Sequence, residues 1–311
     1  MSTFERTSLD PERAHSASRE GEQARARLLA SLPVKERRLT LAGISTAVLE
    51  GGEGPPVVLL HGPGGYAAHW ARIIPALAAG QRVVAPDLPG HGASAAGDLV
   101  LDADRVLLWL EELCAQTCAT PPALVGELFA GSIAARFAIR HPERLSRLVL
   151  VDSFGLCPFE PAPEFMLALT QFQAEPSERT HEQLWRKCAR DLPRLREQMG
   201  ELWKPFETYN LDRARTPGST AALHGLMAEF GFNAIAKGEL ASISVPTTLI
   251  WGRHDLATPL SVAEAASAQY GWPLLVIENA NDAPAIEQPE AFARALHAAL
   301  ASSKKPNGSK P

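Results

Sequence analysis

The sequence has no apolar run long enough to cross a membrane and no excess of positive charge. Its longest apolar runs have the length of strands, and its first residues do not combine a basic start with an apolar stretch. We therefore expect neither export nor a membrane span, and we place the protein in the cytoplasm. The net charge of -5, without basic clusters among aromatic residues, argues against nucleic acid as a partner.

Cysteine is also scarce, with four residues in the 311-residue chain. Cys114 and Cys118 lie at helical spacing on an apolar stripe, which is typical of buried thiols rather than of a disulfide framework or a metal site. We predict no metal site and no cofactor.

The apolar residues, 46% of the chain, follow the pattern of an α/β protein. The segments RRLTLAG and STAVLEGG alternate like the two strands of a hairpin. After them, apolar runs such as PPVVLLHG, QRVVAPDLPG, PALVGE, RLVLVDS, PTTLIWG and PLLVIE alternate with helical stretches. Continuous apolar runs of this kind predict strands covered on both faces, and therefore a mostly parallel sheet with crossover helices.

The strand pattern stops in one long segment, which is rich in helix formers, aromatic residues and charges. We predict an inserted helical lid there. The predicted organisation is a polar N-terminal extension (1–36), a core in two parts (37–153 and 241–302), the lid (154–240) and a disordered tail (303–311).

Five short motifs occur in order on the expected elements: HGPGG, DLPGHGAS, GELFAG, WGRHD and NANDAPAIEQPEAF. Together they resemble the α/β-hydrolase fold family, in its lid-containing branch, over residues 37–300. The resemblance implies a mostly parallel central sheet flanked by helices. It also implies a Ser-His-acid triad, whose positions can be located in this sequence.

The nucleophile position of that family holds a leucine here. The family's strand-to-helix turn reads G-x-S-x-G, and the matching residues place Leu128 at its apex between Gly126 and Gly131. Leucine has no lone pair, so no covalent intermediate can form on it. Ser132 lies one helical turn further on, where a packing role is the simpler interpretation.

The histidine position is also changed, because the loop before the last helix carries Asp282 there. The triad carboxylate is retained as Asp255, in WGRHD. Two carboxylates a few ångströms apart do not both ionise readily, so one should hold a proton. The pair is either an acid/base device or an idle remnant of a degenerate triad.

The oxyanion hole is altered as well. The resemblance gives one donor as the Phe129 amide and places Pro63, which has no N–H, at the other. A shift of the loop could offer the amide of Gly64 or Gly65 instead.

Further residues complete the predicted site. His61 and Gly62 belong to the same loop, Glu127 either supplies a carboxylate or bonds loop amides, and Trp70 either walls the pocket or packs in the core. The predicted catalytic residues are Asp255, Asp282 and Glu127. The predicted substrate-binding residues are His61, Gly62, Pro63, Gly64, Leu128, Phe129 and Trp70.

Three functions follow from these changes. The first is an enzyme that acts on an apolar small molecule by non-covalent acid/base chemistry, as an isomerase, cyclase or lyase. The second is a pseudo-hydrolase that binds a small molecule without catalysis. The third is a hydrolase with a non-standard site, which uses Ser132 or water activated by a carboxylate. Two chemically useful carboxylates favour the first.

Overall fold

The computed structural model describes residues 17–97 and 99–301. The predicted tail (303–311) and the first sixteen residues of the predicted extension lie outside these ranges. Within them, no helix is both long and apolar enough to cross a membrane.

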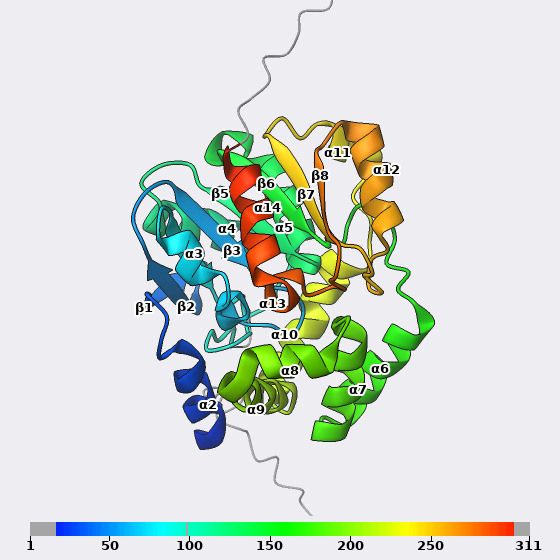
Figure 1. Cartoon of the computed structure of the whole chain (residues 1–311). Coiled ribbons are helices and arrows are strands. Elements are labelled where there is room, and N and C mark those ends of the chain that lie inside the picture. Colours follow the sequence, from blue (N-terminus) through cyan, green and yellow to red (C-terminus); the bar gives the residue numbers. More distant parts are fainter. Residues whose placement is uncertain (1–16, 98, 302–311) are drawn as a thin grey trace, which may run out of the picture.

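Within the described ranges, eight strands form one sheet in the order β1-β2-β4-β3-β5-β6-β7-β8 (Figure 1). The β1–β2 and β2–β4 pairs are antiparallel and the other pairs are parallel, which confirms the predicted hairpin and mostly parallel sheet. The strands are β1 (Lys35–Leu41), β2 (Ile44–Gly51), β3 (Pro56–Leu60), β4 (Arg82–Pro86), β5 (Ala123–Glu127), β6 (Arg147–Val151), β7 (Thr247–Gly252) and β8 (Leu274–Ile277).

Helices cover both faces of the sheet because the apolar side chains of each inner strand alternate between two cores. In β3, Val57 and Leu59 join one core, and Val58 and Leu60 join the other. The first core contains α3 (Ile74–Ala78) and α14 (Pro289–Ala301). The second contains α4 (Ala103–Thr117), α5 (Phe129–Arg140) and α12 (Leu260–Tyr270).

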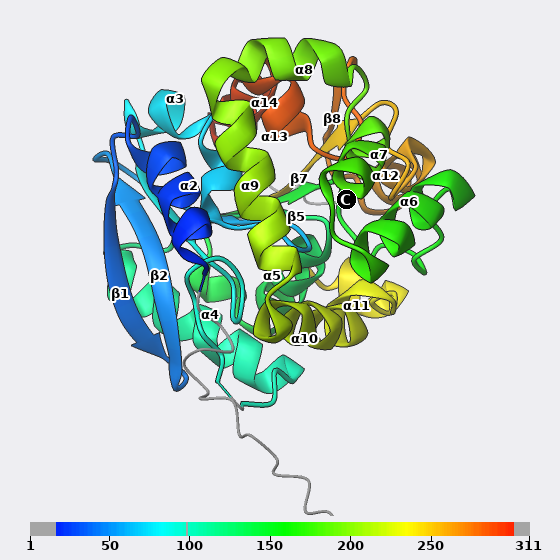
Figure 2. The same cartoon turned by 90° about the horizontal axis from the view of Figure 1, so that it is seen from below.

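A group of helices follows β6 and precedes β7, and lies beyond one end of the sheet (Figures 1 and 2). We call this group the helical insertion. Its helices are α6 (Pro163–Ala174), α7 (Glu178–Cys188), α8 (Leu192–Met199), α9 (Trp203–Ala214) and α10 (Pro217–Leu226). The short helix α11 (Lys237–Ala241) also precedes β7, but it lies toward the other end of the sheet (Figure 1). Shorter helical segments are η1 (Ala67–Trp70), η2 (Pro142–Arg144), η3 (Gly200–Leu202), η4 (Met227–Gly231) and α13 (Pro284–Glu287).

The predicted N-terminal extension contains a packed helix, α2 (Arg19–Leu29), beside α9 (Figure 2). Ser18 caps it by accepting a hydrogen bond from the Gly21 amide, and its apolar Ala24 and Leu28 are buried against the helical insertion. This part of the extension is therefore more ordered than its polar composition indicates, because the few apolar side chains of α2 pack against α9.

Candidate active site

The turn between β5 and α5 has Leu128 at its apex. Leu128 has a φ of 50°, a region that non-glycine residues rarely occupy. The turn is fixed by hydrogen bonds from the Leu128 amide to the Val151 carbonyl (2.9 Å) and from the Phe154 amide to the Leu128 carbonyl (3.0 Å). A Cβ on Gly131 would lie 2.1 Å from Ser153 Oγ, so the close approach requires glycine there.

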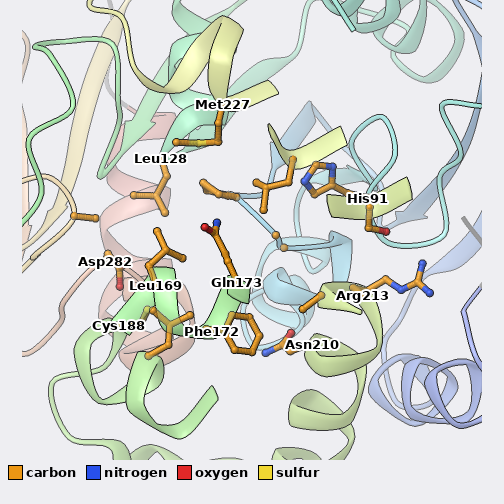
Figure 3. Close-up of a pocket in the computed structure, with 18 of the residues that line it drawn as sticks. His91, Leu128, Leu169, Phe172, Gln173, Cys188, Asn210, Arg213, Met227 and Asp282 are labelled. Carbon is orange, nitrogen blue, oxygen red and sulfur yellow. The ribbon is translucent and has the colours of Figure 1, made fainter. Parts of the chain in front are cut away.

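The Leu128 side chain lines a cavity between the sheet and the helical insertion (Figure 3). The cavity has a volume of about 190 Å³, close to the space in which a buried apolar cavity can hold an aromatic ring. Much of its wall is apolar and comes from the insertion and the β5–α5 turn. Lining residues of this kind include Leu128, Phe154, Phe165, Phe172, Leu184 and Met227.

Asp282 is the one acidic side chain among the described residues that line this cavity. It lies in the loop between β8 and α13 and is only 5% exposed. Its Oδ1 atom has no hydrogen-bond partner within the described ranges. Burial, followed by the nearby charge of Asp255, raises the pKa of Asp282 well above its usual value.

Asp255 follows β7 and does not line the cavity. Its Oδ1 accepts hydrogen bonds from the amides of Ala257 (2.7 Å) and Thr258 (2.9 Å), and its Oδ2 accepts none from an amide or hydroxyl donor among the described residues. Burial raises the pKa of Asp255 to about 8. The predicted pair therefore lies together, with Asp282 toward the cavity and Asp255 behind it.

A third carboxyl group, that of Asp152, lies close to Asp255 and Asp282. Asp152 was not among the residues predicted from the sequence. It follows β6 with a φ of 44°, and its Oδ1 accepts a hydrogen bond from the Gly252 amide (2.8 Å). Its buried Oδ2 accepts no hydrogen bond from an amide or hydroxyl donor of the described chain, and its carboxyl group interacts with that of Asp255. Burial and Asp255 raise the pKa of Asp152. The available signal was an acid directly after the apolar run RLVLV, at the carboxyl edge of the sheet where sites gather.

Glu127, His61 and Gly62 brace the loops beside the cavity without lining it. Glu127 Oε2 accepts a hydrogen bond from the Gly62 amide (3.2 Å), and burial raises the pKa of Glu127 to about 7. His61 Nε2 accepts from the Leu88 amide (3.0 Å), so its Nδ1 carries the proton and donates to the Gly62 carbonyl (2.9 Å). For Glu127 the structure therefore shows the loop-bonding arrangement.

The loop after β3 carries Pro63, which has no amide N–H. Pro63 and Gly64 line the cavity, and Gly65 donates its amide to the Gly62 carbonyl (3.1 Å). The amides of Gly64 and Phe129 have no acceptor in the described part of the chain. The Gly65 amide, by contrast, is already bonded.

Three sequence candidates lie elsewhere. Phe129 is fully buried with its ring 6.1 Å from that of His91, and its side chain does not line the cavity. Trp70 does not wall the cavity: its ring packs against Phe292, 6.0 Å between centroids, in the core on the face of the sheet that carries α14. The position on η1 turns this side chain inward to the core. Ser132 is fully buried on α5, next to Gly155, and does not line the cavity.

Of the free cysteines, Cys188 lines the cavity and its side chain interacts with that of Asp282. Cys114 is buried and free, and Cys118 is free but only half-buried. Among the described residues, no group of three or more His, Cys, Asp or Glu side chains is placed to hold a metal ion.

Comparisons with known proteins bear on the chemistry. A family model described as "alpha/beta hydrolase fold" matches residues 55–289. A pimeloyl-[acyl-carrier protein] methyl ester esterase of Aeromonas hydrophila is 32% identical over 260 residues, which cover 80% of this chain and 96% of the relative. A 2-hydroxymuconate semialdehyde hydrolase of Pseudomonas sp. CF600 is 32% identical over 239 residues, 73% of this chain and 80% of the relative.

Solved structures agree. A meta-cleavage product hydrolase from Pseudomonas fluorescens superposes with a TM-score of 0.71 at 25% identity, covering 85% of this chain and 97% of that chain.

These relatives correct the functional expectation. The relatives named above are esterases and hydrolases, so the expected isomerase, cyclase or lyase chemistry is wrong, and a non-catalytic pseudo-hydrolase is not supported. The error came from treating the loss of a nucleophile as the loss of hydrolysis, although water can attack directly when a base activates it.

Proposed function

The chain belongs to the α/β-hydrolase fold family, and we propose that it is a hydrolase that cleaves an ester of an apolar small molecule with water activated by Asp282. The helical insertion acts as a lid over the substrate. The relatives named above are hydrolytic enzymes, and an ester is the bond that one of them is named for.

The observation that carries this proposal is the unpartnered Oδ1 of Asp282 in the wall of an otherwise largely apolar cavity. A buried carboxylate oxygen without a partner is costly unless a ligand or water bonds to it. The same position leaves the oxygen able to take a proton from a water molecule beside the substrate.

The chemistry proceeds in two steps. Water bonded to Asp282 attacks the carbonyl carbon, the carboxylate takes the water proton, and the carbonyl oxygen becomes an oxyanion that accepts hydrogen bonds from Gly64 and Phe129. When the tetrahedral intermediate collapses, the bond to the leaving alcohol breaks and the protonated Asp282 returns its proton to that oxygen. The products are a carboxylic acid and an alcohol, and no covalent enzyme intermediate forms.

In this mechanism Leu128 forms part of the apolar floor of the cavity and does not act as a nucleophile. A triad hydrolase that loses its serine or histidine loses about a millionfold in turnover, and the oxyanion hole and binding retain about 10³–10⁴ over water. We therefore expect a slow hydrolase in which general-base catalysis contributes about 10²–10⁴-fold.

The test is hydrolysis of p-nitrophenyl acetate and p-nitrophenyl butyrate, with kcat/KM measured above the buffer rate. Asp282→Asn should lower kcat/KM about 100-fold because the amide cannot take the proton. Asp104→Asn, which changes an exposed carboxylate on α4, is the matched control and should leave kcat/KM unchanged.

Two further measurements separate the alternatives. Ser132→Ala should keep the wild-type rate, and rapid mixing should show no burst of p-nitrophenol. A wild-type rate equal to the buffer rate, or full activity in Asp282→Asn, would refute the proposal. Loss of activity in Ser132→Ala would move the chemistry to that hydroxyl.

A further inference from the structure

A second group of polar side chains lines the cavity, away from Asp282. It consists of His69 on η1, Asn210 on α9 and His181 on α7, and we call it the polar pole. Figure 3 draws Asn210 on one side of the cavity and Asp282 on the other, with Phe172 and Cys188 also along the wall.

The polar pole is held by a relay of contacts within the helical insertion. Asn210 Nδ2 lies 3.0 Å from His181 Nε2, so the amide donates and this ring nitrogen accepts. The His181 proton is then on Nδ1, which faces Glu207 Oε1 at 3.8 Å. This arrangement fixes the direction of the Asn210 amide and leaves its oxygen as an acceptor.

Besides His181 Nδ1, which faces Glu207, two atoms of the polar pole lack a hydrogen-bond partner within the described ranges. Asn210 Oδ1 and His69 Nε2 are both buried, and the contact between these two side chains falls short of a well-formed hydrogen bond. Buried polar atoms are nearly always satisfied in folded proteins, and each unsatisfied one costs about 1–3 kcal/mol. Both belong to residues of the cavity wall, so a bound molecule can satisfy them.

The polar pole carries no net charge near neutral pH. Burial lowers the pKa of His69 to about 4, an effect that a side-chain interaction with Asn210 partly offsets. Burial also lowers the pKa of His181 to about 3. The cation of this wall, Arg213, already bonds to Asp212 (2.7 Å) and to the Gly92 carbonyl (3.1 Å). A carboxylate or phosphate would therefore lose its hydration here without gaining a cation of its own.

We propose that the polar pole recognises an uncharged hydrogen-bonding group of the substrate, in particular a hydroxyl on an apolar ring or chain. A hydroxyl both accepts and donates, so it can accept from His69 Nε2–H and donate to Asn210 Oδ1. This inference rests on the proposed function, because it assumes that the cavity binds the substrate. It adds that the substrate is amphipathic, with its ester at Asp282 and its hydroxyl at Asn210.

Binding of three small probes without a hydrolysable bond tests the proposal separately from catalysis. The probes are p-cresol, p-xylene, in which a methyl replaces the hydroxyl, and p-toluate, which carries a carboxylate. The measured quantity is the ratio of the Kd of p-xylene to that of p-cresol, obtained by calorimetry. Asn210→Leu should lower this ratio about tenfold, because one hydrogen bond to the hydroxyl is lost while apolar contact remains.

Controls make the result interpretable. Thr208→Val removes a hydroxyl from the same helix, at a position outside the cavity, and should leave the ratio unchanged. His69→Phe keeps an aromatic ring at position 69 but removes the hydrogen-bonding nitrogen, so it should also lower the ratio. This variant tests the proposal if Asn210→Leu fails to fold. Retained p-xylene binding shows that the cavity persists.

An unchanged ratio of the Kd of p-xylene to that of p-cresol in the folded variants would overturn the proposal that the polar pole binds a hydroxyl. Tighter binding of p-toluate than of p-cresol by the wild type would also overturn it. Failure of ester hydrolysis would leave these binding results standing, so the two proposals can fail separately.

Discussion

At the scale of single residues, the site depends on carboxyl groups that are buried close together. Asp152, Asp255 and Asp282 each have one oxygen that accepts no hydrogen bond from an amide or hydroxyl donor in the described chain, and burial raises the pKa of all three. Their protons therefore leave as a group, with apparent pKa values that belong to the cluster. Asp282 is the member that reaches the cavity, and in the proposed mechanism its ionisation sets the amount of active base.

The pH dependence follows from that cluster. A base with a raised pKa is protonated at low pH, so we expect kcat/KM for p-nitrophenyl acetate to rise with pH well above the usual range of an aspartate. Asp255→Asn removes the like charge with the largest effect on Asp282, while an amide oxygen can still accept from Ala257 and Thr258. The rising limb should then move to lower pH, whereas Asp104→Asn should not move it. A profile flat from pH 5 to 9 in the wild type would contradict this expectation.

The sequence predicted some of these residues better than others. Asp255 and Asp282 were found because short motifs surround them, and Leu128 because small residues define its turn. Asp152 carries no motif, and its role appears only when β6 and β7 pair and bring Gly252 to its side chain. Asn210 and His181 lie in the insertion, where side chains that line a cavity cannot be told from packing residues by sequence pattern.

At the scale of elements, strand positions follow from apolar runs, whereas the packing of α2 does not. Apolar residues fill β3, β5 and β6 because both faces of these strands are covered. The helix α2 is mostly polar, and it is held by contacts with residues distant in sequence, such as the bond from the Ser18 amide to Asp212 (2.9 Å). Contacts of that range leave no local pattern.

An ion pair joins α2 to the loops around the cavity. Arg25 contacts Asp87 (3.4 Å) and Glu36 (2.5 Å), and buried Asp87 also accepts from the amides of Ala67 (2.6 Å) and Ala93 (2.7 Å). The pair therefore connects the N-terminal helix to the segments after β3 and β4.

We expect Arg25→Met to lower the free energy of unfolding by about 1–3 kcal/mol, because Asp87 stays buried without its cation but keeps its amide donors. The measurement is urea unfolding at pH 7.5. Arg27→Met, on the exposed side of the same helix, is the control and should change stability by less than about 0.5 kcal/mol. Equal effects of the two variants would show that the ion pair does not hold α2.

At the scale of the whole molecule, the sheet order explains why one site collects residues from distant parts of the chain. The strands β5, β6 and β7 are parallel neighbours, so Leu128, Asp152 and Asp255 follow strand ends at one edge of the sheet. The loop before α13 brings Asp282 to the same edge, and the helical insertion closes the cavity over it. This framework holds whether or not the nucleophile and base are present, which is why the fold could be predicted while the chemistry could not.

That separation of framework from chemistry predicts that a covalent route can be introduced. The double variant Leu128→Ser with Asp282→His places a hydroxyl at the strained turn and an imidazole between it and Asp255, with the Phe129 and Gly64 amides still available. Rapid mixing with p-nitrophenyl acetate should then give a burst of p-nitrophenol that approaches one equivalent per enzyme. Each single variant lacks either the nucleophile or its base and should give no burst. If the folded double variant also gives none, the cavity has changed too far for the serine, the histidine and the oxyanion donors to meet.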